Sequence, residues 1–509
     1  MADLVPGTFS SDPLLNSPNP YPLFTWLISV FPLQFLYVWT TLLYVLIQAV
    51  YSYSLFGIAN RLATIYAHPK RLISFLALFL FLHTNAVWGP YFGMVTGMDI
   101  RWVWDSGIAE QGVLRGYLQP SGFGVFLILS FHLLIERKYT WAIFWITPAA
   151  IMHAGYLFIG FILVFLYLAF SRFDKKAFLA SIVLLLLVSP YAYYIIMEFL
   201  MIGNEAKLAL EAAVRFGYED NIHLNPYNWI NPKLYVQIAI VIMAVLSTWK
   251  TRVSSFILAV TSASAVLTIC AYAFNSMTLI SLNPWRFSII IIPVCSTLVL
   301  AKIVSSSMWQ SARPYAFTLF GVISGAIVYF RVMGNASDSF VSTWVWFQLG
   351  IVLSCFICIR IMKTFNVQKP FRLLELLVIF GFIFTGLTEL YLERTHKNNT
   401  DQFITISAIK GKTEKSTIYV VPPHWTSLRM NAQKSVFADN NLVYGPALPP
   451  LIYRLDLLEK ARNTGNYQPI LNSIPDSVSV KLVLDDYMYE DSGIEHSSIA
   501  SNIKIYKLR

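Results

Sequence analysis

The sequence predicts an α-helical polytopic membrane protein with about twelve transmembrane helices and a small α/β domain outside the cytoplasm. The first observation is composition, because 56% of the 509 residues are hydrophobic and 13% are charged. Soluble proteins contain about 25% charged residues, and one water-soluble core of this length cannot bury so much apolar surface. The second is the alternation of apolar runs with short basic loops. The third is a polar tail with strand-like stretches.

Apolar runs define the candidate spans, since a helix needs about 20 mostly apolar residues to cross the hydrocarbon core. The candidates are residues 24–50, 71–95, 122–136, 139–152, 154–171, 177–200, 233–248, 254–274, 285–304, 314–332, 341–362 and 372–392. Several are short. The two runs that meet at Met152 and His153 can form either a tight hairpin or one broken helix.

Basic residues occupy every second loop. They are Arg61, Lys70 and Arg71; Arg137 and Lys138; Arg172, Lys175 and Lys176; Lys250 and Arg252; Lys302 and Arg313; and Arg360, Lys363, Lys369 and Arg372. By the positive-inside rule these loops are cytoplasmic, so loops 96–121, 201–232, 275–284 and 333–340 and both termini lie outside. This grouping also explains the net charge of +10 without a nucleic-acid partner.

The chain ends differ from the apolar body, which we place at 24–392. Residues 1–23 are polar and rich in proline, and are expected to be extracytoplasmic. Residues 393–509 have mixed charge. Strand-like stretches there alternate with a helix-like one, which favours a small α/β domain. The stretches are Thr417–Val421, Pro449–Ala461, Ser479–Leu484 and Ile503–Leu508.

The first outer loop of interest, 96–121, combines acids, arginines and aromatic residues. Its candidate functional residues are Asp99, Arg101, Asp105, Glu110, Arg115 and Gln119, among Trp102, Trp104 and Tyr117. A carboxylate here suits a general base or a ligand of a divalent cation, and an arginine suits a phosphate. We therefore predict Asp99 and Asp105 as catalytic and the others as substrate-binding. The alternative is a solvated loop with an interfacial aromatic belt.

Four more residues are candidate substrate ligands. His223 and Asn225 lie in the dense polar stretch of loop 201–232, where a capped turn is the alternative. Arg286 opens segment 285–304 on its outer side and can pair with a lipid phosphate or extend to the interface. His153 lies within an apolar stretch, where an ionisable group indicates function; the alternative is a neutral histidine bonded between helices.

Motifs of soluble enzymes are absent from the sequence. It contains no Walker A motif, no GxGxxG after a strand, no HExxH and no GxSxG. An ATP-driven pump is therefore not expected.

Four stretches resemble the GT-C type of membrane glycosyltransferase, and more closely a bacterial branch with that architecture. They are SDPLLNSPNPYPLFTWLISV (11–30); LQPSGFG with the following PAAIMHAGYLF; the loop containing His223 and Asn225 with LNPWRFS; and IYVVPPHWTSLRMNAQKSVFADN (418–440) with YRLDLLEKA. Together they run along most of the chain.

The resemblance implies an active site on the outer face of a bacterial inner (plasma) membrane. There a sugar on a polyprenyl phosphate would be transferred to a lipid, glycan or protein, with a carboxylate as base and cationic groups on the leaving phosphate. In this family one helix precedes the first outer loop, and that loop bears the catalytic acids. Here only Asp12 precedes segment 24–50. Either the start is truncated, or the acids are lost, or Asp99 and Asp105 replace them.

Two other functions remain open at this point. One is a transporter or flippase for envelope glycans or lipids, although paired halves typical of secondary transporters are not visible. The other is a non-catalytic relative with a binding or structural role in envelope assembly, which the missing acids favour.

Overall fold

The computed structural model describes the chain in parts. The described residues are 21–30, 35–83, 103–109, 111–114, 118–197, 226–274, 276, 279–280 and 282–309, followed by 417–420, 435–436, 458, 460–461, 464, 466–472, 474, 479–484, 496–500 and 503–507. They fall into two compact units. The helical unit comprises the described residues within 40–192 and 222–390, and the candidate spans 314–332, 341–362 and 372–392 lie outside the described residues.

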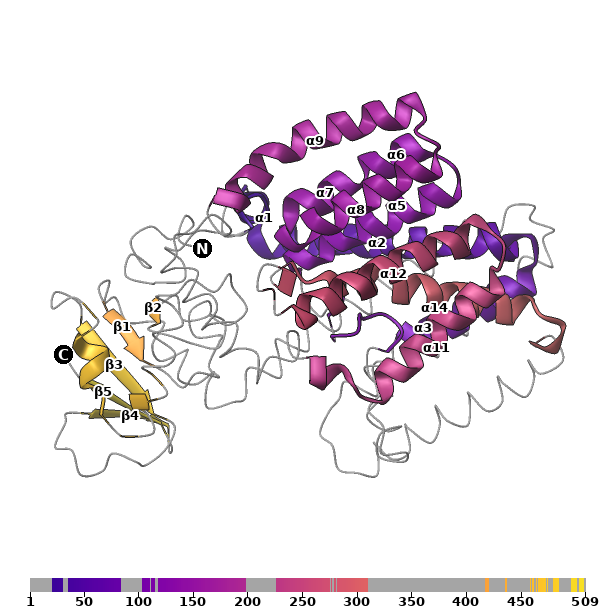
Figure 1. Ribbon diagram of the computed structural model, residues 1–509. Helices are drawn as coiled ribbons and strands as arrows, with labels where there is room; N and C mark the ends of the chain where they lie inside the picture. The colour runs from indigo at the N-terminus through magenta and orange to yellow at the C-terminus, as the bar shows by residue number, and fades with distance from the viewer. Residues whose placement is uncertain are drawn as a thin grey trace, which may run out of the picture. The chain divides into compact units, whose positions relative to one another are not determined.

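Helices dominate the described residues up to 309 (Figure 1). The α-helices are α1 (Pro22–Ser29), α2 (Leu36–Ala63), α3 (Pro69–His83), α5 (Val125–Ile135), α6 (Tyr139–Phe144), α7 (Ile146–Met152), α8 (Ala154–Phe170), α9 (Lys175–Ile195), α11 (Pro232–Ser247), α12 (Arg252–Ala273) and α14 (Ser288–Ser305). Short 3-10 helices are η2 (Ile65–Ala67), η3 (Pro120–Gly124), η5 (Pro226–Trp229) and η6 (Pro284–Phe287).

Each candidate span up to 285–304 overlaps a helix, but the bounds of the first one are wrong. Segment 24–50 is not one helix, because α1 ends at Ser29 and α2 runs from Leu36 to Ala63. Pro32 lies between them in the sequence, and a proline lacks the N–H that a continuous helix needs. Apolar content alone does not reveal such a boundary.

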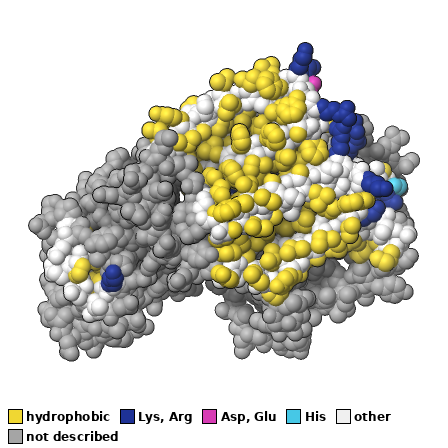
Figure 2. Space-filling view, in the orientation of Figure 1, with side chains coloured by type: hydrophobic (Ala, Val, Ile, Leu, Met, Phe, Trp, Pro, Cys, Tyr) yellow, Lys and Arg dark blue, Asp and Glu magenta, His cyan; other side chains and the backbone are white. Residues whose placement is uncertain are grey.

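Four helices among the described residues are long and apolar enough to cross a membrane. They are Val38–Ala63, Lys175–Ile195, Arg252–Ala273 and Pro284–Ser305. Large apolar side chains such as Phe178, Leu186 and Ile269 are exposed on them. Figure 2 shows hydrophobic side chains spread over the face of the helical unit in view. Contiguous apolar surface of this kind suits lipid rather than water, as expected of a membrane protein.

The two runs that meet at Met152 and His153 form a tight hairpin. His153 has extended backbone angles, and α7 and α8 pack against each other on either side of it. Gly160 allows this close approach, since a Cβ there would lie 2.8 Å from the Ile146 side chain. The α6–α7 limb spans about 14 residues, or roughly 21 Å, which is less than the 30 Å hydrocarbon core. The α6–α7 limb alone is thus too short to cross the hydrocarbon core.

The basic loops meet at one end of the helical unit. Arg61 lies in the last turn of α2, Arg137 follows α5 and Arg252 begins α12, and all three line one pocket. Figure 2 shows the Lys and Arg side chains gathered along one edge of this unit. The charge alternation in the sequence therefore predicted correctly that these three loops share a side. That this side is cytoplasmic stays a prediction.

The described C-terminal residues contain a five-stranded sheet in the order β2-β1-β3-β5-β4. Its strands are β1 (Thr417–Val420), β2 (Ser435–Val436), β3 (Ser479–Leu484), β4 (His496–Ala500) and β5 (Ile503–Lys507), with a short helix α22 (Gln468–Asn472). Strand β1 pairs in parallel with β2 and β3, and β5 pairs antiparallel with β3 and β4. Strands β1, β3 and β5 coincide with the strand-like stretches of the sequence. An α/β domain over 393–509 stays a prediction.

Candidate functional site

The described part of the first outer loop, residues 103–109 and 111–114, is buried rather than solvated; we call it loop 103–114. Val103, Ala109 and Val113 are each 1% exposed. The loop folds back on itself through an antiparallel bridge between Ser106 and Gly112. This turn is closed by the Gly107 amide, which donates to the Gln111 carbonyl at 2.6 Å.

Side chains from two distant helices hold this loop. The Ile108 amide donates to Ser288 Oγ at 2.9 Å, and Ser296 Oγ donates to the Trp104 carbonyl at 3.1 Å. Both serines belong to α14 and are eight residues apart, so the loop follows that helix for about 12 Å. From α11, Gln237 Nε2 donates to the Val103 and Ser106 carbonyls at 3.2 and 3.0 Å.

A non-helical segment among apolar helices needs hydrogen-bond partners for its backbone N–H and C=O groups. Its backbone polar groups cannot find water in the hydrocarbon region, and irregular backbone occurs there only when it is buried in protein or lines a cavity. The bonds from α11 and α14 meet that requirement. A buried loop of this kind loses free energy for every backbone polar group that lacks a partner. It is therefore the feature of this unit that most strongly indicates function.

Arg286 lies at one side of the loop in what we call the arginine cluster, made of Arg286, Gln111 and His153. Its Nε donates to Gln111 Oε1 at 3.1 Å. Its Nη1 lies 3.4 Å from both ring nitrogens of His153, so the guanidinium faces the ring instead of donating a linear bond to one nitrogen. His153 Nδ1 accepts from the Gly155 amide at 3.0 Å and caps α8, which places the ring proton of neutral His153 on Nε2.

Glycine leaves room beside this cluster. A Cβ at Gly155 would meet Arg286 Nη1, so the guanidinium could not keep its present position. The tip of the α7–α8 hairpin therefore lies against the guanidinium with no side chain between them. Tyr156 completes the wall: its ring centroid lies 4.7 Å from that of His153, and its hydroxyl donates to the Ser121 carbonyl at 2.7 Å.

Asp105 lies in a second group on the same loop, which we call the aspartate cluster, made of Asp105, Tyr51 and His83. The Asp105 Oδ1 atom is buried, and its charge lies close enough to interact with Tyr51. The Tyr51 hydroxyl lies 2.9 Å from His83 Nε2, and His83 Nδ1 lies 2.9 Å from the Phe79 carbonyl. A carbonyl only accepts, so Nδ1 carries a proton and neutral His83 accepts from Tyr51 through Nε2. The charge of Asp105 thus acts on a tyrosine that is hydrogen-bonded to a histidine.

The structure describes four of the predicted site residues. It brings His153 and Arg286 together, and it places Asp105 on the buried loop. Gln119 lies at the start of η3, where its carbonyl accepts from the Gly122 amide at 2.9 Å. The others lie outside the described residues: Asp99, Arg101, Glu110, Arg115, His223 and Asn225.

Three residues of the two clusters were missed. Gln111, next to the predicted Glu110, provides the amide that contacts Arg286. Tyr51 and His83 come from α2 and α3. His83 carries the same sequence signal as His153, an ionisable ring within an apolar run, and that signal could have found it.

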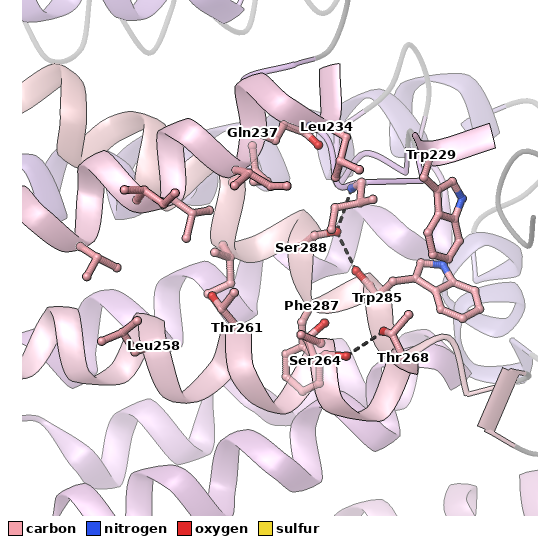
Figure 3. Close-up of a pocket in the computed structure, with 18 of the residues that line it drawn as sticks. Trp229, Leu234, Gln237, Leu258, Thr261, Ser264, Thr268, Trp285, Phe287 and Ser288 are labelled. Atoms are coloured by element: carbon pink, nitrogen blue, oxygen red, sulfur yellow. Dashed lines mark hydrogen bonds between the residues drawn. The ribbon is translucent and has the colours of Figure 1, made fainter. Parts of the chain in front are cut away.

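An apolar pocket of about 510 Å³ lies between α11, α12 and the start of α14 (Figure 3). Trp229 and Trp285 meet at one end with ring centroids 4.8 Å apart, and Ile108, Gln237 and Ser288 connect the pocket wall to the buried loop. The 3-10 helix η6 therefore presents Trp285 to the pocket, while the next residue, Arg286, belongs to the arginine cluster.

No group of three or more His, Cys, Asp and Glu side chains that could hold a metal ion occurs among the described residues. A divalent cation at the outer loop stays a prediction, because Asp99 and Glu110 are not described.

The geometry defines a helical protein, with helices suited to a membrane, that has a polar loop buried between its helices. Family models, curated proteins and solved structures give no match to this chain. The function is therefore inferred from the site itself.

Proposed function

We propose that the chain is a GT-C-type glycosyltransferase that transfers a sugar from a polyprenyl-phosphate donor to an extracytoplasmic acceptor. The observation that carries the proposal is the buried loop 103–114, which joins a carboxylate and an arginine cluster next to an apolar pocket. A donor of this class needs the same three elements: a base for the acceptor, a cation for the phosphate and an apolar surface for the isoprenoid chain.

Arg286 suits the leaving phosphate. Its contacts with Gln111 and His153 fix the direction of the guanidinium while leaving other N–H groups for a ligand. Neutral His153 adds no positive charge of its own, so Arg286 is the cation of this cluster. A guanidinium held in this way needs little reorganisation when negative charge develops on a phosphate oxygen.

Asp105 suits the base. As the acceptor hydroxyl attacks the anomeric carbon, a new C–O bond forms, the C–O bond to the phosphate breaks, and the hydroxyl proton passes to the carboxylate. The polyprenyl phosphate leaves with the bonding electron pair. The charge of Asp105 acts on Tyr51, whose hydroxyl is hydrogen-bonded to His83.

The apolar pocket suits the isoprenoid chain. Its lining is almost entirely apolar, and side chains such as Ile242 and Ile269 are 53% and 66% exposed. A chain that enters from the lipid phase would replace bilayer contacts with side-chain contacts at little cost in desolvation, because both environments are apolar. The pocket ends at Trp285, one residue before Arg286.

The test is sugar transfer by the full chain, reconstituted in liposomes and supplied with a panel of polyprenyl phosphates that carry radiolabelled sugars. We expect label to move to an extracytoplasmic glycan, lipid or peptide acceptor from at least one donor. Asp99→Asn and Asp105→Asn are the site variants to run beside it. Unchanged turnover in both variants rejects the proposed site, and no transfer from any donor rejects the proposed activity.

A further inference from the structure

A second polar site lies at the basic end of the helical unit, in the pocket lined by Arg61, Arg137 and Arg252. Its volume is about 360 Å³. The arginines lie at or beside the ends of three helices, α2, α5 and α12, that are far apart in the sequence. The side chains of Phe131 and Phe256 also line it, and both are 2% exposed. The pocket thus combines an apolar floor with a cationic rim.

The charge of this rim is not balanced by the protein residues that the structure describes. None of the ion pairs among them involves Arg61, Arg137 or Arg252. Glu136 is the acid beside the pocket, and its carboxylate lies 2.6 Å from Lys138 Nζ. This hydrogen bond from Lys138 holds the pKa of Glu136 below its usual value. Glu136 is thus paired with Lys138 and its charge also acts on Arg61, and one carboxylate among these cations leaves the rim with a net positive charge.

One local detail favours an anionic ligand. Tyr139 Oη accepts a hydrogen bond from Arg252 Nη1, so the hydroxyl proton of Tyr139 remains available to donate. Arg137 has a φ of 61°, the left-handed conformation that commonly ends a helix. Glycine adopts this conformation freely, so the Arg137 side chain can be removed without strain.

We propose that this pocket binds the phosphate group of an anionic lipid. Arginine and tyrosine donors match phosphate oxygens, and an apolar floor beneath them accommodates the glycerol and first acyl carbons. Basic pockets between helix ends on the cytoplasmic side are where anionic lipid headgroups bind. A free phosphate compound would use the same donors, so the experiment separates the two sources.

The chain contains a matched pair of variants for the test. Arg172 also has a left-handed φ, 58°, and belongs to another basic turn, but it does not line the pocket. Arg137→Gly and Arg172→Gly remove the same side chain from the same kind of backbone, and glycine adopts that backbone freely. Neither variant is expected to impair folding.

The measurement is the thermal unfolding midpoint of the full chain in phosphatidylcholine nanodiscs with increasing phosphatidylglycerol, and separately with glycerol 1-phosphate in the buffer. We expect phosphatidylglycerol to raise the midpoint. We expect Arg137→Gly, and likewise Arg252→Gln, to need about fivefold more of it, as about 1 kcal/mol per basic residue implies. Arg172→Gly should behave as the wild type.

Each outcome decides the proposal. A shift with phosphatidylglycerol alone supports a lipid ligand, and a shift with glycerol 1-phosphate as well supports phosphate recognition from either source. Equal weakening in Arg137→Gly and Arg172→Gly would mean a diffuse surface charge effect and would overturn the pocket. Absence of any shift in the wild type would overturn it as well.

Discussion

Asp105→Asn will lower the rate of sugar transfer by about 10²–10⁴-fold, the contribution typical of a positioned general base. Asparagine has nearly the same shape but cannot take the acceptor proton. The loop should keep its fold, because Ser288, Ser296 and Gln237 hold its backbone by hydrogen bonds that the substitution does not touch. The measurement is single-turnover transfer in liposomes at saturating donor.

The matched control for Asp105 is Asp174→Asn. Asp174 caps α9 at the basic end, where its Oδ2 accepts from the Lys176 and Ala177 amides at 3.1 and 3.2 Å. Asparagine also caps helices well, so this variant should keep full activity and stability. If Asp105→Asn and Asp174→Asn transfer sugar equally fast, Asp105 is not the base.

Arg286→Gln will lower the turnover number by about 10²–10³-fold, as the loss of one preorganised charge-stabilising donor does in other enzymes. The guanidinium would act on charge that develops as the phosphate leaves, so the loss should fall on kcat more than on KM. Glutamine retains one amide donor for Gln111 and preserves most of the volume. The measurement is the separate determination of kcat and KM for the donor.

A graded control sharpens this second prediction. Arg286→Lys keeps the charge but loses the planar set of donors, so its rate should fall between those of the wild type and Arg286→Gln. Arg172→Gln removes an arginine at the basic end and should have no effect. A rise in KM with unchanged kcat would instead assign Arg286 to ground-state binding of the donor.

The positions of the helices were largely predictable, and the reason is physical. Apolar runs predicted the bounds of α8, α11, α12 and the η6–α14 segment to within two residues. The reason is that a helix pairs its backbone N–H and C=O groups internally, as a segment in lipid must. Charge alternation predicted that Arg61, Arg137 and Arg252 share a side. The break between α1 and α2 was not predicted, because a proline within an apolar run can either kink a helix or end it.

The burial of loop 103–114 could not be predicted from the sequence. Its acids and glutamine are typical of a solvated loop. What buries it are single polar side chains on apolar helices: Ser288 and Ser296 from α14 and Gln237 from α11, all more than 120 residues away. Nothing local indicates which carbonyl each of them will meet. For the same reason Glu110 was selected and Gln111, which contacts Arg286, was not.

The central claim is that a polyprenyl phosphate places its phosphate at Arg286 and its chain in the apolar pocket. The most direct test is photolabelling of the reconstituted chain with a diazirine-bearing polyprenyl phosphate, followed by mass-spectrometric mapping. The account predicts labels on α11 and α12, around Ile242 and Ile269, that are lost in Arg286→Gln. The account would be contradicted by labels on the exposed apolar side chains of α9, Phe178 and Leu186, with none in the pocket. In that case the labelling would also be equal in the wild type and Arg286→Gln.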